Sequence, residues 1–418
     1  MKAMFSTLVV SVGLVASEPL GAQGTGASAT PAERRIEQAR QALGKAPANS
    51  GSHVDLAMAL ARRARETSDP ALYAQAEKSI AEALELSPDS FEAMKARAWV
   101  LLGQHRFGEA RELAETLNKR VPDDVMVYGL LTDANVELGD YERAEQSCQW
   151  MLNLRPGNVP ALTRAAYLRE LFGDVDGAME LMAQALDSTS PNETEDHAWL
   201  LTQMAHLRLM TGKAAQAEKL LDEALASFPT YHYALAQLAK VRTGQGRHAE
   251  AATLLRQRYD AAPHPENLYD LAVALERAGS RDAAKVAFAE FERKALAETH
   301  GADNANRELI FYYADHAQRA ADALAVARRE VGRRSDVHTL DAYAWALFRN
   351  GRLVDARKAM EQALAVGLRE ASILYHAGAI AAKLGERETA SDRLRQSLEV
   401  NAASDVAADA RRELARLR

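Results

Sequence analysis

A recurring spacing of 34 residues is the feature that most constrains how this chain of 418 residues can fold. Alanine recurs at one register position, in steps of 33, 34 or 39 residues, at Ala76, Ala110, Ala144, Ala178, Ala217, Ala251, Ala284, Ala323, Ala356 and Ala390. Glycine occupies a second position in the same register, at Gly139, Gly173, Gly212, Gly246, Gly279, Gly351 and Gly385. Proline marks a third, at Pro88, Pro122, Pro156, Pro229 and Pro263. Three residue types in one register indicate many copies of one structural unit.

The clearest copy, Val125–Asn158, has the pattern of two amphipathic helices joined by a tight corner. Gly139 stands where the first helix should stop, because glycine accepts the left-handed conformation found at helix C-termini. Asp140 is placed to cap the second helix, and Pro156 prevents its continuation. Each helix has about 14 residues and is marginal alone in water. The hairpin therefore needs neighbouring hairpins to bury its apolar face.

This pattern resembles the tetratricopeptide repeat, a helix–turn–helix unit of 34 residues. In Val125–Asn158 the pattern positions hold Tyr128, Leu131, Thr132, Asn135, Ala144, Cys148 and Pro156. The resemblance covers about 350 residues. It implies an all-α fold, an α-solenoid in which about ten such hairpins form a right-handed superhelix with short capping helices at its ends.

The register predicts the following organisation: a signal peptide at 1–22, a flexible tether at 23–31, an N-terminal capping helix at 32–52, the repeat array at 53–402, and a C-terminal capping helix at 403–418. One unit, 304–336, is degenerate because it lacks the corner glycine and carries Phe311 where a small residue is expected. We expect a local change of superhelical pitch there. The acidic segment Glu193–His197 accounts for one 39-residue step and is expected to be a solvated loop.

The N-terminus has the features of a secretory signal peptide. Lys2 precedes the apolar run Ala3–Ala16, small residues follow, and the run is too short to span a membrane comfortably. Cleavage is expected after Ala22, with Ser17 as the alternative. The mature chain would then be exported, periplasmic or secreted, with no stable membrane span. The alternative is that the segment is retained as an N-terminal membrane anchor.

Composition and motifs argue against several classes of function. The net charge is −7, with 51 basic and 58 acidic residues well mixed, so no nucleic-acid partner is indicated. The dispersed histidines show no metal-ligand spacing, and no catalytic motif is present. Gly244–Ala249 matches a dinucleotide fingerprint but follows a repeat helix rather than a strand. Cys148 is the only cysteine and takes a buried position of the repeat. We therefore expect no enzyme activity, catalytic residue, metal or cofactor.

The resemblance to the family implies that the second, fifth, ninth and twelfth places of each repeat face a concave groove. At these places the predicted partner-binding residues are Trp99, Tyr167, Trp199, His206, Tyr233, Lys240, Tyr269, Trp345, Phe348 and Tyr375. Large aromatic side chains suit an extended peptide or an amphipathic helix, because they dominate interface energetics. The alternative is that these side chains cover neighbouring repeats inside the array. No ninth place holds asparagine, so the family's clamp for C-terminal carboxylates is not indicated.

These observations favour a non-enzymatic scaffold or assembly factor in the bacterial cell envelope, which binds a peptide or helix of another protein in its aromatic groove. The second hypothesis is an accessory protein that binds or helps to export a glycan or cell-wall polymer, because the same aromatic side chains can stack on sugars.

Overall fold

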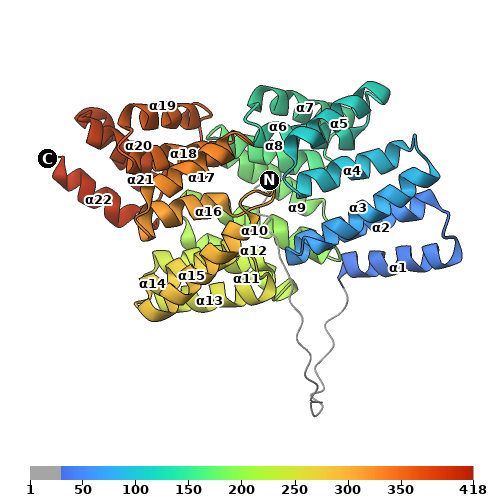
Figure 1. Cartoon of the computed structure of the whole chain (residues 1–418), viewed down its shortest axis with the longest axis horizontal. Helices are drawn as coiled ribbons and strands as arrows, with labels where there is room; N and C mark the ends of the chain where they lie inside the picture. The colour runs from blue at the N-terminus through green and yellow to red at the C-terminus, as the bar shows by residue number, and fades with distance from the viewer. Residues whose placement is uncertain (1–29, 418) are drawn as a thin grey trace, which may run out of the picture.

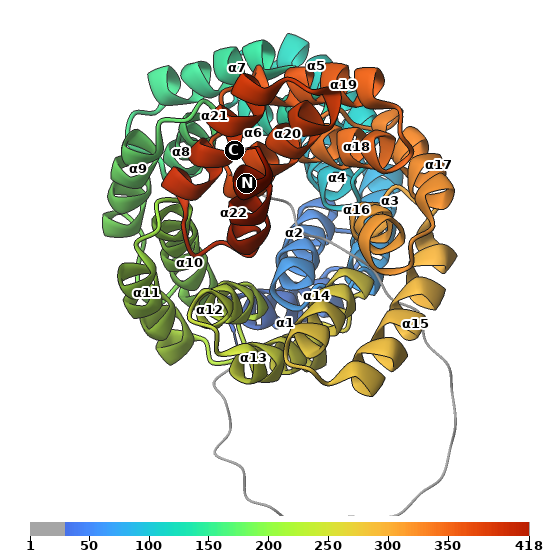
Figure 2. The same ribbon diagram turned by 90° about the vertical axis from the view of Figure 1, so that its left-hand side faces the viewer.

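The computed structural model describes residues 30–417, which form 22 α-helices and one π-helical turn, with no strand in that range. The predicted signal peptide (1–22) and nearly all of the predicted tether (23–31) lie outside the described residues. Figure 1 shows the helices arranged side by side along the chain, and Figure 2 shows that they wind into a ring around a central axis. The predicted all-α superhelical repeat fold is confirmed.

Ten consecutive hairpins occupy residues 50–400, each with one helix toward the axis and one on the periphery (Figure 2). The inner helices are α2 (Ser50–Thr67), α4 (Phe91–Gly103), α6 (Val125–Glu137), α8 (Val159–Leu171), α10 (Thr194–Met210), α12 (His232–Gly244), α14 (Pro265–Arg277), α16 (Asn306–Phe311), α18 (Val337–Arg349) and α20 (Ala371–Leu384). The outer helices are α3 (Ala71–Leu86), α5 (Phe107–Arg120), α7 (Tyr141–Leu154), α9 (Val175–Asp187), α11 (Ala214–Ser227), α13 (His248–Ala261), α15 (Arg281–Glu298), α17 (Ala320–Val331), α19 (Leu353–Leu364) and α21 (Arg387–Val400). The terminal helices are α1 (Pro31–Lys45) and α22 (Ala407–Arg416).

The third hairpin, α6 and α7, shows how local sequence sets the unit. The side chain of Asp124 accepts a hydrogen bond from the Val127 amide at 2.9 Å and so caps α6. Gly139 takes the left-handed conformation at the corner, with φ of 75°. Ala144 and Cys148 are buried where α7 packs on its neighbours, and burial raises the pKa of the Cys148 thiol to about 11. Cys148 therefore behaves as a buried, uncharged thiol.

The N-terminal boundaries differ slightly from the sequence prediction. A capping box between Thr30 and Glu33 starts α1, so the predicted tether ends one residue early. The predicted capping helix 32–52 stops at Lys45, because Asn49 already caps α2 by accepting a hydrogen bond from the Ser52 amide at 2.9 Å. The array therefore begins at residue 50 rather than 53.

The degenerate unit carries a widened helical turn. After the short α16, residues Tyr312–His316 form a π-helical turn, and the Ala317 amide donates to the Tyr312 carbonyl at 2.8 Å. Gln318 then takes the left-handed corner conformation with φ of 54°, in the place that glycine fills in most other units. The insertion of a residue into a helical turn rotates the side chains that follow it. The irregularity of this unit thus lies in its backbone.

The superhelix completes one turn and then touches itself along a line that we call the seam. Corners of the first turn meet inter-repeat loops that lie about 196 residues later in the chain. At one end of the seam, the Ser68 carbonyl accepts a hydrogen bond from His264 Nε2 at 2.7 Å. Next to it, His105 Nδ1 lies 3.3 Å from a carboxylate oxygen of Asp303. Ser68, His264 and His105 are all buried where the two turns meet.

The seam continues along the remaining corners. The Ser335 amide donates to the Glu137 carbonyl at 3.2 Å, and the Asn401 side-chain amide donates to the Leu209 carbonyl at 2.9 Å. Two or more contacts of this kind fix the axial distance between the turns. The first and second turns are therefore joined along the length of the seam.

Candidate functional site: the lumen of the superhelix

The first turn encloses a cavity of about 1330 Å³, which we call the lumen cavity. Its walls are mainly the inward faces of α2, α4, α6, α8, α10 and α12, with contributions from α1, from inter-repeat loops and from single residues of α3, α5, α7 and α14. The volume exceeds that of most pockets for small molecules, which measure roughly 300–1,000 Å³. Because successive inner helices line the wall, the cavity brings together residues from widely separated parts of the chain.

The lumen cavity is lined by six of the ten predicted partner-binding residues, namely Trp99, Tyr167, Trp199, His206, Tyr233 and Lys240. The other four belong to α14, α18 and α20 and do not line it: Tyr269, Trp345, Phe348 and Tyr375. Within the lining, the indoles of Trp99 and Trp199 are partly exposed and Lys240 is exposed, so these side chains are accessible from the cavity. Six members of the predicted set therefore meet in one cavity, whereas the other four lie on later repeats outside it.

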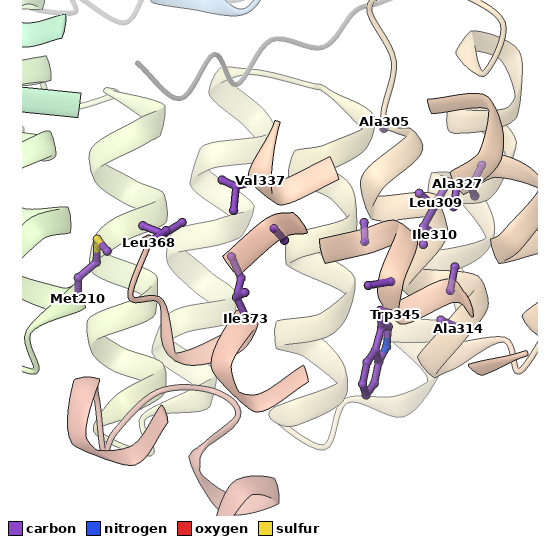
Figure 3. Packing of buried hydrophobic residues seen from close by; sticks show 14 of the residues in the cluster. Met210, Ala305, Leu309, Ile310, Ala314, Ala327, Val337, Trp345, Leu368 and Ile373 are labelled. Carbon is purple, nitrogen blue, oxygen red and sulfur yellow. The ribbon is translucent and has the colours of Figure 1, made fainter. Parts of the chain in front are cut away.

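Trp345 is the clearest departure, because its indole lies in the hydrophobic core and is only 5% exposed (Figure 3). Its Nε1 donates to both carboxylate oxygens of Asp315, at 3.0 and 3.1 Å. The ring stacks on His376 at 4.2 Å and on Phe348 at 4.8 Å between centroids. For Trp345 and Phe348, the alternative that the aromatics cover neighbouring repeats is the one that the packing supports.

His206 and Tyr233 are held in place by contacts with other residues of the wall. His206 Nε2 is 2.9 Å from a carboxylate oxygen of Glu170, and both side chains are buried. The Tyr233 ring packs against His232 at 3.9 Å between centroids. These two residues are positioned by the array before any ligand is present. Their side chains form part of the cavity wall.

A buried ion pair that sequence reasoning missed joins two neighbouring wall helices. Arg164 of α8 makes a two-point contact with Asp133 of α6, at 2.8 Å from Nε and 2.6 Å from Nη2. Arg164 Nε also donates to the Gly129 carbonyl at 3.2 Å. The sequence did hold a signal, because a carboxylate and a guanidinium stand 31 residues apart at facing places of consecutive units. Such two-point pairs are rigid and directional.

The acidic segment Glu193–His197 is also different from the prediction. It is not a solvated loop, because α10 begins at Thr194 and the side chain of Glu195 is fully buried. Arg65 of α2 donates to Glu195 at 3.1 Å and to Asp196 at 2.9 Å. Burial raises the pKa of the Glu195 carboxyl, and the two neighbouring carboxylates help to raise the pKa of the Arg65 guanidinium. The acidic residues are there to compensate the arginines of α2.

The lining as a whole has balanced charge. It carries six cationic side chains, Arg35, Arg62, Arg65, Arg155, Arg164 and Lys240. It carries six carboxylates, Asp55, Asp133, Glu137, Glu193, Asp196 and Asp270. Burial raises the pKa of Glu137 to about 7, so this carboxyl titrates near neutral pH. The cavity therefore offers paired charges and aromatic surfaces, with no excess of either sign.

A carboxyl near the seam should make stability depend on pH. Glu298 at the end of α15 has one carboxylate oxygen buried without a hydrogen-bond partner, and burial raises its pKa to about 8. The folded chain therefore binds a proton between pH 4.5 and pH 8 that the unfolded chain has released, so this group makes stability fall as pH rises. In Glu298→Gln, we expect the free energy of unfolding to fall less between pH 5.5 and pH 8.5, by on the order of 2 kcal/mol.

Urea titrations at the two pH values measure this difference. Glu290→Gln is the matched control, because Glu290 lies on the same helix with a side chain that is 44% exposed. The control should keep the pH dependence of the parent chain. An equal pH dependence in all three proteins would show that the Glu298 carboxyl is ionised in the folded state at neutral pH.

Two further observations concern the described residues, 30–417. They contain no cluster of three or more histidine, cysteine, aspartate or glutamate side chains with the geometry to hold a metal ion. No helix among them combines the length and apolar character that crossing a membrane requires.

Comparisons with known proteins agree with this architecture. Sequence profiles of the tetratricopeptide repeat match residues 72–134, 173–239 and 342–390. No curated protein matches the chain. Among solved structures, human IFIT1 as a dimer with PPP-AAAA has a TM-score of 0.50 and 14% identity, and the match covers 89% of this chain and 95% of that one.

Yeast Tom70 gives a TM-score of 0.41 at 13% identity, covering 92% of this chain and 95% of that chain. A tetratricopeptide-repeat protein of Thermus thermophilus gives 0.38 at 23% identity, covering 43% of this chain and 92% of its own. The likeness to IFIT1 shows a shared superhelical fold. The repeat profiles and the ten stacked hairpins identify the chain as a tetratricopeptide-repeat protein, an all-α scaffold of the kind used for protein–protein interaction.

Proposed function

We propose that this protein binds a peptide segment of another protein in the lumen cavity and serves as a non-enzymatic scaffold or assembly factor in the bacterial cell envelope. The observation that carries the proposal is the convergence of Trp99, Trp199 and Tyr233 on one cavity of about 1330 Å³. Aromatic anchors in a concave site supply most of the binding energy in protein interfaces. The proposed location after export rests on the apolar run that follows Lys2.

The charge of the lining favours a polypeptide over a nucleic acid. IFIT1, which shares the fold, was solved with PPP-AAAA, a ligand rich in phosphate. Proteins that bind a nucleic-acid backbone neutralise its phosphates mainly with lysine and arginine side chains. Here six cations are matched by six carboxylates, and Arg164 and Arg65 are engaged in ion pairs with carboxylates of the wall. A peptide with mixed charges and apolar side chains complements such a surface better than a phosphate backbone.

A glycan is the second candidate, because the indoles of Trp99 and Trp199 are partly exposed in the same cavity. Indole faces stack on sugar rings as readily as on peptide side chains. The experiment that tests the proposed function therefore includes oligosaccharides as a separate arm.

The test selects 12-residue peptides from a displayed random library on the purified chain, residues 23–418. Each selected peptide is then measured against the parent chain, a Trp99→Ala/Trp199→Ala variant and a Trp150→Ala control. Trp150 lies on the outer helix α7 and is 52% exposed, so its loss leaves the lumen unchanged. We expect binding at least tenfold weaker for the double variant, because each lost hot spot costs about 1–2 kcal/mol or more. We expect no change for the control.

Circular dichroism must show that the double variant remains folded. Peptides that bind all three proteins alike would place the site outside the lumen cavity. A chain that selects no peptide but changes its tryptophan fluorescence with cell-wall oligosaccharides would support the glycan instead.

A further inference from the structure

We propose that the seam makes the lumen cavity a channel loaded from one end: it admits a flexible polypeptide with a free terminus and excludes the same segment when both of its ends are folded. The inference rests on the proposed function and adds that the bound segment of the partner must have a free terminus. It follows from the way in which the two turns of the superhelix touch.

The seam is tight at the backbone. A β-carbon built on Gly139 would lie 2.6 Å from the Ser335 carbonyl oxygen, and one on Gly173 would lie 2.7 Å from the Gly367 carbonyl oxygen. Both distances are too short for a methyl group, so the two turns approach more closely than any other residue would permit. A polypeptide cannot pass sideways between surfaces that lack room for one carbon atom.

The seam is also anchored by buried polar groups. Arg334 lies on the second turn, 3.5 Å from the Glu137 carboxylate of the first turn, and its Nε is 2.9 Å from Glu330. These three side chains are almost fully buried. The Val337 amide donates to the Tyr141 hydroxyl at 2.9 Å across the same contact. Separating the turns would break the contact between Arg334 and Glu137 and the hydrogen bond between Val337 and Tyr141, while Arg334 would keep Glu330 on its own turn.

Because the corners of the first turn form the seam, the rim that faces away from the seam carries the opposite ends of the inner helices. Inter-repeat loops of the first turn lie on that rim, and Arg155, Asn158 and Ser190 from these loops line the cavity. Arg35 of α1 lines it as well. At the other end of the superhelix, α22 projects over part of the ring in Figure 2. Because the seam bars the side, a long ligand has to enter along the axis, and we infer that it does so at the rim near α1.

An extended segment can enter such a channel with its free end first. Each residue then adds about 3.3–3.6 Å along the channel, and only the width of a single chain with its side chains has to fit. A folded domain cannot follow the segment into the lumen cavity. Even a 100-residue domain has a radius of gyration of about 13 Å, which is far too large for a cavity of about 1330 Å³. A segment flanked by folded domains at both ends therefore reaches the lumen only if the seam opens. A segment with one free end does not need that opening.

The test uses a peptide selected in the library experiment. It is presented free, with a small folded domain fused to one end, and with folded domains fused to both ends through linkers of two residues. We expect the free and singly fused forms to bind alike and the doubly fused form to associate at least tenfold more slowly. Equal association of all three forms would overturn the inference while leaving the proposed function intact. Failure of the free peptide to bind would instead count against the proposed function.

Alanine substitutions at glycines test whether the seam is what keeps the doubly fused peptide out. Gly139→Ala/Gly173→Ala places methyl groups inside the seam, whereas Gly246→Ala/Gly351→Ala places them where nothing lies within 4 Å. All four glycines have left-handed φ of 73–83°, so both variants carry the same backbone strain. We expect the seam variant, and not the control, to bind the doubly fused peptide within about threefold of the free peptide.

A folded seam variant that still excludes the doubly fused peptide would show that the barrier is not the seam and would overturn the inference. If that variant does not fold, the comparison of the three peptide forms on the parent chain decides by itself.

Discussion

Replacing Trp345 with alanine is expected to lower the free energy of unfolding by about 3–5 kcal/mol, the usual cost of truncating a buried tryptophan. The indole is 5% exposed, stacks on His376 and Phe348, and donates to Asp315. Its removal opens a cavity next to the π-helical turn and takes a hydrogen-bond donor from a carboxylate. Chemical denaturation followed by circular dichroism measures the change.

Trp150→Ala is the control, because that indole is 52% exposed and stacks only on Tyr128, at 5.9 Å. We expect it to cost no more than about 1 kcal/mol. If Trp345→Ala kept the stability of the parent chain but lost the selected peptides, the residue would belong to the binding surface, as the repeat register first predicted.

Replacing Arg65 with alanine should also cost about 3–5 kcal/mol, because it breaks a buried ion pair from one side. Glu195 would remain fully buried, with the Tyr231 hydroxyl at 3.1 Å as its hydrogen-bond donor. The same denaturation experiment measures the loss.

The double variant Arg65→Met/Glu195→Gln separates the pair from its surroundings. Both changes together remove the charges while keeping similar volumes, and the glutamine still accepts a hydrogen bond from Tyr231. We expect the double variant to be more stable than Arg65→Ala by about 2 kcal/mol. If the double variant lost as much stability as Arg65→Met and Glu195→Gln lose together when each is made alone, the two side chains would act independently.

Much of the fold was readable because its determinants are local. The alanine, glycine and proline positions repeat within each hairpin, so Gly139 and Asp140 could be assigned to a corner and a cap from their neighbours alone. The inward face of the first turn was readable for the same reason, because a residue's place in a helix fixes the direction of its side chain. Six of the ten predicted residues accordingly line the lumen cavity.

The predictions went wrong where one segment meets another that is distant in the sequence. Glu193–His197 reads as a loop until Arg65, some 130 residues earlier, is placed against Glu195. Trp345 reads as a groove residue until the π-helical turn of the preceding unit brings Asp315 to its indole nitrogen. Neither partner can be identified from the local pattern, because helical periodicity says which face a residue is on and not what covers that face.

The sequence by itself therefore determined the class of fold, the repeat boundaries to within a few residues, and the inward face of the first turn. Only the tertiary structure decided that the superhelix closes along a seam, since contacts such as Ser68 with His264 join residues 196 positions apart. The physical reason is that each repeat specifies its packing on the next one, whereas the pitch accumulates small rotations over many repeats. Whether the turns touch, and so whether the groove becomes an enclosed channel, depends on that sum.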